Sequence, residues 1–392
     1  MLKKRKFMII VLLSALLMAG CERGNEAAGR DHAVQSGKKE LYRESEAIAE
    51  NYREIYEQAV KTGTLGTLEN VEEIVSYLGN LGYTAVDKEN QVDMVNAKRV
   101  EEFNHKVEEK KLADLMVISV MEDGGFIRYD LKTEEGKISV TQSLLSWNEG
   151  HPESDYSKEY PAYTWDYSDS GYLFFEQYRP AGYDGPSGHT AIRVQPLDRK
   201  CRELNRKYIL PVSYHLNNMF ITDWNEEEFR DLDFYDLFHP MYEMKYGKEF
   251  PYTYTYTGDF YEIPENEFED LFMTYFQMDS SVLRQRTTYF AENHTYQYRP
   301  RGRYDFGTTA NIPYPEVTDY EENEDGTLKL TVCAVWPQKN TAKALLSEVV
   351  IRPLSEERFQ YVSNQIIPTE GQMEPAWYER RLTKEEWEQL AP

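Results

Sequence analysis

The sequence predicts an α+β fold, because its helical and strand patterns fall into separate blocks instead of alternating one by one. Residues 39–110 carry apolar side chains at three- and four-residue steps, which is the period of amphipathic helices. Residues 115–145 hold three apolar-rich runs separated by glycine-containing turns, as in successive hairpins. A helix followed by strands is predicted again over residues 263–366, so both ends of the chain indicate the same class.

Three amphipathic helices are predicted in the first block. The first ends near Gly63, the second lies between a capping Thr67 and Gly82, and the third covers residues 97–110. The apolar stripes that mark them are Leu41, Ile48, Tyr52, Ile55, Ala59 and Val60 in the first, Leu68, Val71, Ile74, Val75, Leu78 and Leu81 in the second, and Val100, Phe103 and Val107 in the third.

An antiparallel meander follows these helices. Its turns fall at Asp123-Gly124-Gly125 and Glu135-Gly136, where glycine supplies the positive φ of a tight hairpin. Two short strands are expected before it, at residues 83–86 and 91–95. Helices and meander together predict a first α+β domain over residues 39–150.

Residues 151–262 are predicted as a tyrosine-rich, mainly β region. It opens on the polar, proline-flanked segment HPESDYSKEYP, which favours a domain boundary near residue 150. Tyrosine is abundant in the chain, with 31 residues, and it suits half-buried sheet faces as well as binding surfaces. The elements expected in this region are strands at 172–177 and 190–195 and helices at 197–207 and 225–237.

The C-terminal region, residues 263–392, is predicted to place one helix on a curved antiparallel sheet. The helix begins near Pro264, and a hairpin turn at Asp325-Gly326 lies between two of the strands. The helix stripe is Phe268, Leu271, Phe272 and Tyr275, and further strands are expected at 344–353 and 359–366. This element order resembles cystatin-like and NTF2-like modules over residues 263–366, a resemblance that implies a fold but no function.

The first twenty residues are predicted to be an export signal. Four basic residues precede an apolar run from Phe7 to Met18, which is about 18 Å long as a helix and too short for a bilayer core of about 30 Å. A basic start, a short apolar middle and small residues at the end are typical of a secretory signal.

The end of that signal, Leu17-Met18-Ala19-Gly20-Cys21, resembles the lipobox of bacterial lipoproteins. It departs from the usual pattern at Met18, where leucine is more common. The resemblance implies that Cys21 receives a diacylglyceryl group and becomes the N-terminus, and two acyl chains hold a protein on a membrane. The alternative is a plain secretory signal with a chance cysteine. Polar residues 21–38 then predict a flexible tether, and the expected location is the outer face of the bacterial cell membrane.

The charge of the chain limits its partners. The formal net charge is −24, and removal of residues 1–20, which carry four basic and no acidic side chains, makes it −28. Such a charge argues against binding to nucleic acid and to anionic polymers. With Cys21 lipidated, only Cys201 and Cys333 remain, and two cysteines predict no disulfide framework, although they could pair.

The sequence contains no complete motif for catalysis or for the binding of a metal or cofactor. The sequence lacks HExxH and any glycine-rich phosphate loop, and the pair His239 and Glu243 leaves a metal under-coordinated. GPSGH at 185–189 places His189 where the nucleophile elbow requires glycine. Nothing near Cys201 predicts an activated thiol. The sequence therefore predicts no metal, no cofactor and no catalytic residue.

Two aromatic trios are the candidate binding residues. Tyr163, Trp165 and Tyr167 alternate in AYTWDYS, and Tyr252, Tyr254 and Tyr256 alternate in YTYTYTG. On strands each trio would project from one face. Such a face either packs against another layer of the fold or forms an aromatic platform for a sugar, peptide or aromatic ligand.

The leading functional hypothesis is a lipid-anchored surface protein that binds an envelope protein, a glycan or a small ligand without catalysis. In its lipobox and its aromatic, acidic body the chain is similar to surface lipoproteins of Gram-positive bacteria whose function is not known. The alternatives are a solute-binding lipoprotein of an import system, which requires two lobes of βαβ units, and an envelope hydrolase or hydrolase inhibitor.

Overall fold

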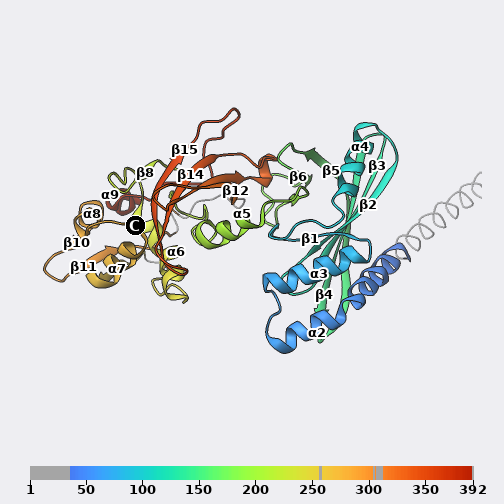
Figure 1. Ribbon diagram of the computed structural model, residues 1–392, viewed down its shortest axis with the longest axis horizontal. Coiled ribbons are helices and arrows are strands. Elements are labelled where there is room, and N and C mark those ends of the chain that lie inside the picture. Colours follow the sequence, from blue (N-terminus) through green and yellow to red (C-terminus); the bar gives the residue numbers. More distant parts are fainter. Residues whose placement is uncertain (1–35, 256–257, 303–304, 306–311, 391–392) are drawn as a thin grey trace, which may run out of the picture. The chain divides into compact units, whose positions relative to one another are not determined.

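The structure, a computed structural model, describes residues 36–390 except 256–257, 303–304 and 306–311 (Figure 1). The chain forms two compact units, Met1–Ala162 and Tyr163–Pro392. In both units helices accompany sheets that are wholly or mainly antiparallel, which confirms the predicted α+β class. No helix among the described residues is long and apolar enough to cross a membrane.

The first unit begins with helices and ends with a sheet. Residues 36–51 are helical, so the first helix starts within the segment 21–38 that was predicted as a tether, while residues 21–35 lie outside the described part. The other elements of this unit are α2 Arg53–Thr62, α3 Leu68–Asn80, β1 Thr84–Asp87, α4 Lys98–Glu108, β2 Ala113–Val120, β3 Phe126–Glu134, β4 Lys137–Asn148 and the first part of β5 His151–Tyr167.

The helix ends follow the capping residues that the sequence predicted. Gly63 ends α2 at φ 71°, and the Thr67 side chain accepts a hydrogen bond from the backbone N–H of Asn70 at the start of α3. The strand expected at 91–95 is absent, since Val95 makes only one isolated bridge, to Ala85. The three predicted helices are therefore confirmed, and the prediction of a strand at 91–95 is wrong.

The sheet of the first unit runs in the order β1-β2-β3-β4-β5. β1 lies parallel to β2, and β2 to β5 form an antiparallel meander, as predicted for β2 to β4. Its core packs the stripes of the N-terminal helices on the sheet, with Ile74, Leu78, Ile118 and Phe126 fully buried. Tyr52 is also buried, and its hydroxyl donates to the carbonyl of Gly124 at 2.9 Å.

The predicted position of the domain boundary, near residue 150, is wrong. The polar segment 151–161 belongs to β5 and pairs with β4 from Asn148↔His151 to Ser139↔Pro161, so the chain divides at 162/163 instead. Of its side chains only Ser154 and Tyr160 are buried. A strand with one solvated face needs no apolar run, because pairing with β4 satisfies its backbone.

The second unit holds an antiparallel pair of strands, two further sheets and most of the aromatic core. Its elements are β6 Tyr172–Gln177, β7 His189–Arg193, α5 Arg199–Leu204, a π-helical turn Asn205–Ile209, β8 Trp224–Asn225, α6 Phe234–Tyr246, β9 Tyr261–Pro264, α7 Glu265–Tyr275, α8 Ser280–Arg286, β10 Tyr289–Phe290, β11 Thr295–Tyr298, β12 Tyr314–Glu322, β13 Leu328–Val335, a 3₁₀ turn Pro337–Lys339, β14 Leu346–Pro353, β15 Phe359–Ile366 and α9 Lys384–Leu390.

The main sheet of this unit has the order β12-β13-β14-β15-β8 and is antiparallel throughout. The predicted hairpin at Asp325-Gly326 joins β12 to β13, and Gly326 adopts φ 81°. Helix α7 packs its predicted stripe into the same core, with Phe268, Leu271 and Phe272 fully buried. A smaller sheet, β10-β11-β9, contacts α7 through β9 and β11.

The helix predicted over residues 225–237 is displaced. Trp224 and Asn225 form β8, and the Asn225 side chain accepts from the backbone N–H groups of Glu227 and Glu228, which makes a local turn. Asp233 caps the true helix, α6, by accepting from the N–H groups of Tyr235 and Asp236. Glu226, Glu227 and Glu228, an acidic run that the predicted helix would have held in its first turn, therefore precede α6.

Candidate functional site

A cleft of about 510 Å³ in the second unit is the best candidate for a binding site. Its volume lies within the range of about 300–1,000 Å³ that is usual for small-molecule pockets. The residues that line it come from the segment before α6, from α6, from the loop after α6, from β11 and its continuation, and from the C-terminal segment: Pro211, Val212, Ser213, His215, Leu216, Tyr235, Asp236, His239, Pro240, Glu243, Glu249, Phe250, Tyr252, Thr253, Tyr254, Tyr298, Pro300, Arg301 and Arg381.

The walls of the cleft are aromatic, and their polar tips are engaged within the protein. The Tyr252 hydroxyl donates to Glu267 at 2.8 Å, and the Tyr235 hydroxyl accepts from the backbone N–H of Thr288 at 2.6 Å. The ring of His239 stacks on Phe250 with centroids 4.5 Å apart. Because the hydroxyls of Tyr252 and Tyr235 already have partners, these walls offer a ligand chiefly ring carbon.

Tyr254 is the most exposed tyrosine of the cleft, at 38%. Its ring packs directly on the backbone of Gly302: a Cβ atom at position 302 would lie 2.3 Å from the Tyr254 ring carbon Cε2. Glycine at position 302 therefore leaves free the space that the Tyr254 ring occupies.

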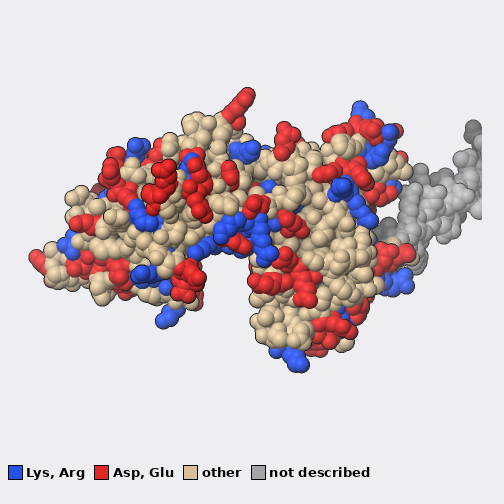
Figure 2. All heavy atoms as spheres, viewed as in Figure 1, with Lys and Arg blue, Asp and Glu red and all other residues tan. Residues whose placement is uncertain are grey.

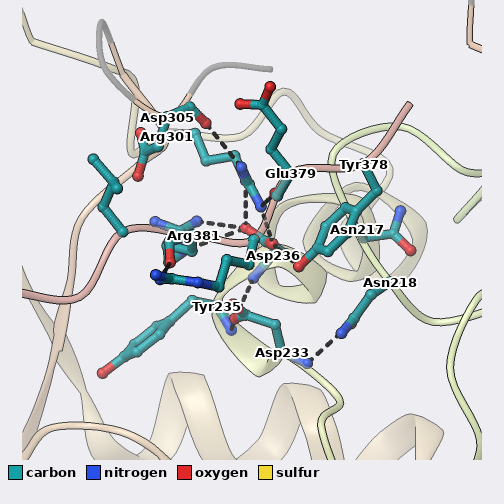
Figure 3. A network of polar contacts seen from close by, with 12 residues as sticks. Asn217, Asn218, Asp233, Tyr235, Asp236, Arg301, Asp305, Tyr378, Glu379 and Arg381 are labelled. Carbon is teal, nitrogen blue, oxygen red and sulfur yellow. Dashed lines mark hydrogen bonds and ion pairs between the residues drawn. The ribbon is translucent and has the colours of Figure 1, made fainter. Parts of the chain in front are cut away.

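The floor of the cleft is a buried ion-pair network centred on Asp236 (Figure 3). Arg301 binds Asp236 in a bidentate manner, with Nε–Oδ1 at 2.8 Å and Nη2–Oδ2 at 2.6 Å. Arg381 approaches the same carboxylate, with Nη2–Oδ1 at 2.8 Å, and Tyr378 donates its hydroxyl to Oδ2 at 3.2 Å. The Asp236 side chain is fully buried, so these contacts replace its hydration.

The two guanidinium groups also hold the backbone around the floor. Arg301 donates to the carbonyls of Asp305 at 2.8 Å and Glu379 at 2.7 Å, and Arg381 donates to the carbonyl of Arg299. The network therefore ties α6, the segment after β11 and the C-terminal segment together. This explains why the cleft can be built from parts of the chain that are far apart in sequence.

Asp233 adds a second carboxylate beside this network. Burial, together with the nearby charge of Asp236, raises the pKa of Asp233 to about 6, while Arg381 and Arg301 oppose the shift. Asp233 therefore places a second carboxyl group next to the two guanidinium groups of the floor.

The segment before α6 is held in an unusual conformation by one buried amide. Ser213 and Leu216 have φ of 55° and 53°, a region that residues other than glycine seldom adopt. The Asn217 side chain donates to the carbonyls of Val212 and His215, both at 3.0 Å, and accepts from the N–H of Met219. Strained backbone of this kind clusters at binding and active sites, and here it carries His215 to the cleft.

Two histidines and two glutamates stand at the exposed parts of the lining. Burial lowers the pKa of His215, and the neighbouring His239 and Arg301 lower it further. His239 Nε2 and Glu243 Oε1 are 3.2 Å apart on one face of α6. Glu249 lies just after the helix, where its side chain is exposed.

The two predicted aromatic trios lie on different elements of the structure. Tyr163, Trp165 and Tyr167 lie on the end of β5 in the second unit, where Trp165 stacks on Phe175 of β6 at 5.9 Å and Tyr163 stays 63% exposed. The interpretation of this trio as a packed sheet face therefore fits Trp165, and Tyr163 alone is prominently exposed.

The second trio meets the cleft, although not on a strand. Tyr252 and Tyr254 lie in the loop after α6 and line the cleft, whereas Tyr256 lies outside the described residues. Asp236, Arg301, Arg381 and His215 were not recognised from the sequence. The pair His239 and Glu243, which the sequence analysis rejected as metal ligands, also lines the cleft.

The other candidate residues do not form a site of their own. Cys201 and Cys333 are buried and free, and burial raises the pKa of the Cys201 thiol to about 11, the opposite of an activated nucleophile. Ser187 is exposed in a loop and accepts from the backbone N–H of His189. Among the described residues, no group of three or more His, Cys, Asp and Glu could hold a metal ion.

Comparison with known sequences places the chain in a family. The sequence model of a family of unknown function (DUF6070) matches residues 38–381, so the chain belongs to that family. The match spans both units and includes all of the described cleft residues. No curated protein and no solved structure matches the chain.

Proposed function

We propose that this member of the DUF6070 family is a lipid-anchored binding protein of the bacterial envelope, and that the cleft of its second unit holds a small ligand. The observation that carries the proposal is the cleft itself. Its aromatic walls, fixed by internal hydrogen bonds, surround a small set of polar groups, which is the composition of ligand pockets. The lipobox at Cys21 supports the location, although that residue lies outside the described part.

The alternative functions have less support. A solute-binding protein of an import system would have two lobes of βαβ units, whereas β1 and β2 form the only parallel pair among the named, described strands. A thiol hydrolase would need an activated cysteine, and burial raises the pKa of Cys201. Glu243 and Glu249 would be the carboxylates of a glycosidase, but both are exposed, whereas the acid of a glycosidase stands in a desolvated pocket.

A ligand-observed NMR screen tests the binding site. A library of small polar and aromatic compounds would be screened against the full-length protein in a polyoxyethylene detergent. We expect a set of binders whose signals weaken at least fivefold with the Tyr254→Ala variant, because this exposed ring forms part of the cleft wall.

The matched control is Tyr163→Ala, which removes the exposed tyrosine of the other aromatic trio. It should leave the binders unchanged. Binders lost with Tyr163→Ala but kept with Tyr254→Ala would move the site to β5 and contradict the proposal, as would a screen without binders.

A further inference from the structure

Building on this proposed function, we infer that the cleft of the second unit selects a small organic cation, an amine or quaternary ammonium compound. The inference rests on the balance of charge around the cleft, on the C-terminal half of α6 and on the aromatic walls. A neutral sugar and an anion are the competing ligand classes.

The positive charges of the floor are cancelled by neighbouring carboxylates. Arg301 and Arg381 both bind Asp236, whose side chain is fully buried. Asp233 lies close enough to both guanidinium groups that they lower its pKa. The carboxylate of Asp236 and the neighbouring Asp233 therefore offset the positive charge of the two guanidinium groups, which reduces the repulsion that a cationic ligand would meet.

The carboxylates that line the cleft beyond its floor belong to two glutamates. Glu243 and Glu249 line it, and Glu267 lies behind the wall, where it accepts the hydrogen bond of Tyr252. No lysine lines the described part of the cleft. Acidic side chains are also spread over much of the face in Figure 2, in keeping with the net charge of −24. The local charge and the overall charge thus both attract cations.

Helix α6 contributes further negative potential. The cleft follows one face of this helix from Tyr235 to Glu243, and the helix ends at Gly247, just before Glu249. A helix C-terminus carries partial negative charge, which favours cations. Pro240 lies inside the helix and has no N–H, so the carbonyl of Asp236 lacks its usual helical donor. Both residues line the cleft.

The aromatic walls complete a site for a cation. Ring faces attract ammonium groups within about 6 Å of the ring centroid, and the effect strengthens where water is excluded. Phe250, Tyr252 and Tyr254 come from one loop that follows directly after Gly247. They therefore combine with Glu243 and Glu249 at the same end of α6. An ammonium group placed there would meet ring carbon and carboxylate oxygen together.

Choline and 3,3-dimethylbutanol test the charge directly, because they have nearly the same shape and differ in the positive nitrogen. Titration calorimetry on the full-length protein, in a polyoxyethylene detergent at pH 7.5 and low salt, should show choline binding at least tenfold more tightly. Raising the ionic strength to about 0.5 M should weaken choline binding several-fold, since salt screens the attraction. Glucose and acetate, tested in the same way, represent the neutral sugar and the anion.

The variants Glu243→Gln and Glu249→Gln remove the two exposed charges and keep the side-chain shape. Each should raise the Kd for choline about three- to tenfold. Both residues are exposed, so folding is not at risk. Glu324→Gln, an exposed glutamate at the hairpin between β12 and β13, is the matched control and should leave the Kd unchanged.

Equal binding of choline and its neutral analogue would overturn the inference. Binding of glucose or acetate but not choline would overturn the inferred ligand class and leave the proposal of a ligand-binding cleft intact. An NMR screen whose binders are all neutral or anionic would have the same consequence. Unchanged choline binding in both glutamine variants would show that choline does not bind in the cleft.

Discussion

Replacing Asp236 by asparagine is expected to lower the free energy of unfolding of the second unit by about 3–5 kcal/mol. The substitution keeps the size of the side chain and removes the one charge that two buried guanidinium groups share. Arg301 and Arg381 have relative side-chain exposures of only 5% and 10%. Without the carboxylate they would repel each other in surroundings where water cannot screen them.

Chemical denaturation followed by tryptophan fluorescence measures this effect, because Trp336 and Trp377 are buried in the core of the second unit. Asp231→Asn is the matched control: it makes the same chemical change five residues earlier at an exposed position, and its effect should stay within about 0.5 kcal/mol. A loss of less than about 1 kcal/mol for Asp236→Asn would mean that the network does not hold the floor of the cleft.

Replacing Cys21 by serine is expected to remove the protein from the set of acylated membrane proteins. The proposal rests on Leu17-Met18-Ala19-Gly20-Cys21, since a lipobox is read only when its last residue offers a thiol. Two acyl chains make membrane attachment stable, whereas a chain without residues 1–20 would carry a net charge of −28 and would have no electrostatic attraction to anionic lipid. Growth with labelled palmitate, followed by membrane fractionation, measures both label and location.

Cys201→Ser is the control for this experiment, because it removes a buried thiol and leaves the lipobox intact. It should keep label and membrane association. An unlabelled native protein would contradict lipid anchoring, and so would a Cys21→Ser variant that takes up as much label as the native protein. Neither result would bear on the cleft, so anchoring and ligand binding are tested separately.

The helices and hairpins could be predicted because their signals are local. Thr67 caps α3, Pro264 precedes α7, and Gly326 supplies the positive φ of the β12–β13 turn, each within a few residues of the element it delimits. Buried stripes such as Phe268, Leu271 and Phe272 repeat at the helical period and need no knowledge of the partner surface.

The wrong predictions concern segments whose secondary structure depends on residues that are distant in the sequence. Segment 151–161 has the composition of a linker and becomes a strand because β4 lies beside it. Helix α6 was hidden by Pro240 in its interior and by the acidic run before it, in which Asn225 forms a turn of its own.

The cleft could not be predicted as a unit for the same reason. Its lining spans residues 211–381, and its floor depends on ion pairs between Asp236, Arg301 and Arg381. No short pattern marks such residues, because each occurs in an unremarkable polar context. Tyr252 and Tyr254 were singled out through their alternation, but they lie in a loop, so the reason for choosing them was wrong.

The most direct test of the central claim measures the electrostatic potential inside the cleft. Thr253 lines the cleft with an exposed side chain, and a Thr253→Cys variant would react with methanethiosulfonate reagents that carry either a trimethylammonium or a sulfonate group. The buried Cys201 and Cys333 should stay unreactive, and a Cys21→Ser background removes the remaining thiol. Ser187→Cys, in an exposed loop of the same unit, corrects for the intrinsic reactivity of the two reagents.

An acidic, aromatic cleft that selects cations predicts a cation-to-anion rate ratio about tenfold higher at position 253 than at position 187, and slower modification at 253 when choline is present. A ratio equal to or below that at position 187, with no protection by choline, would contradict the account.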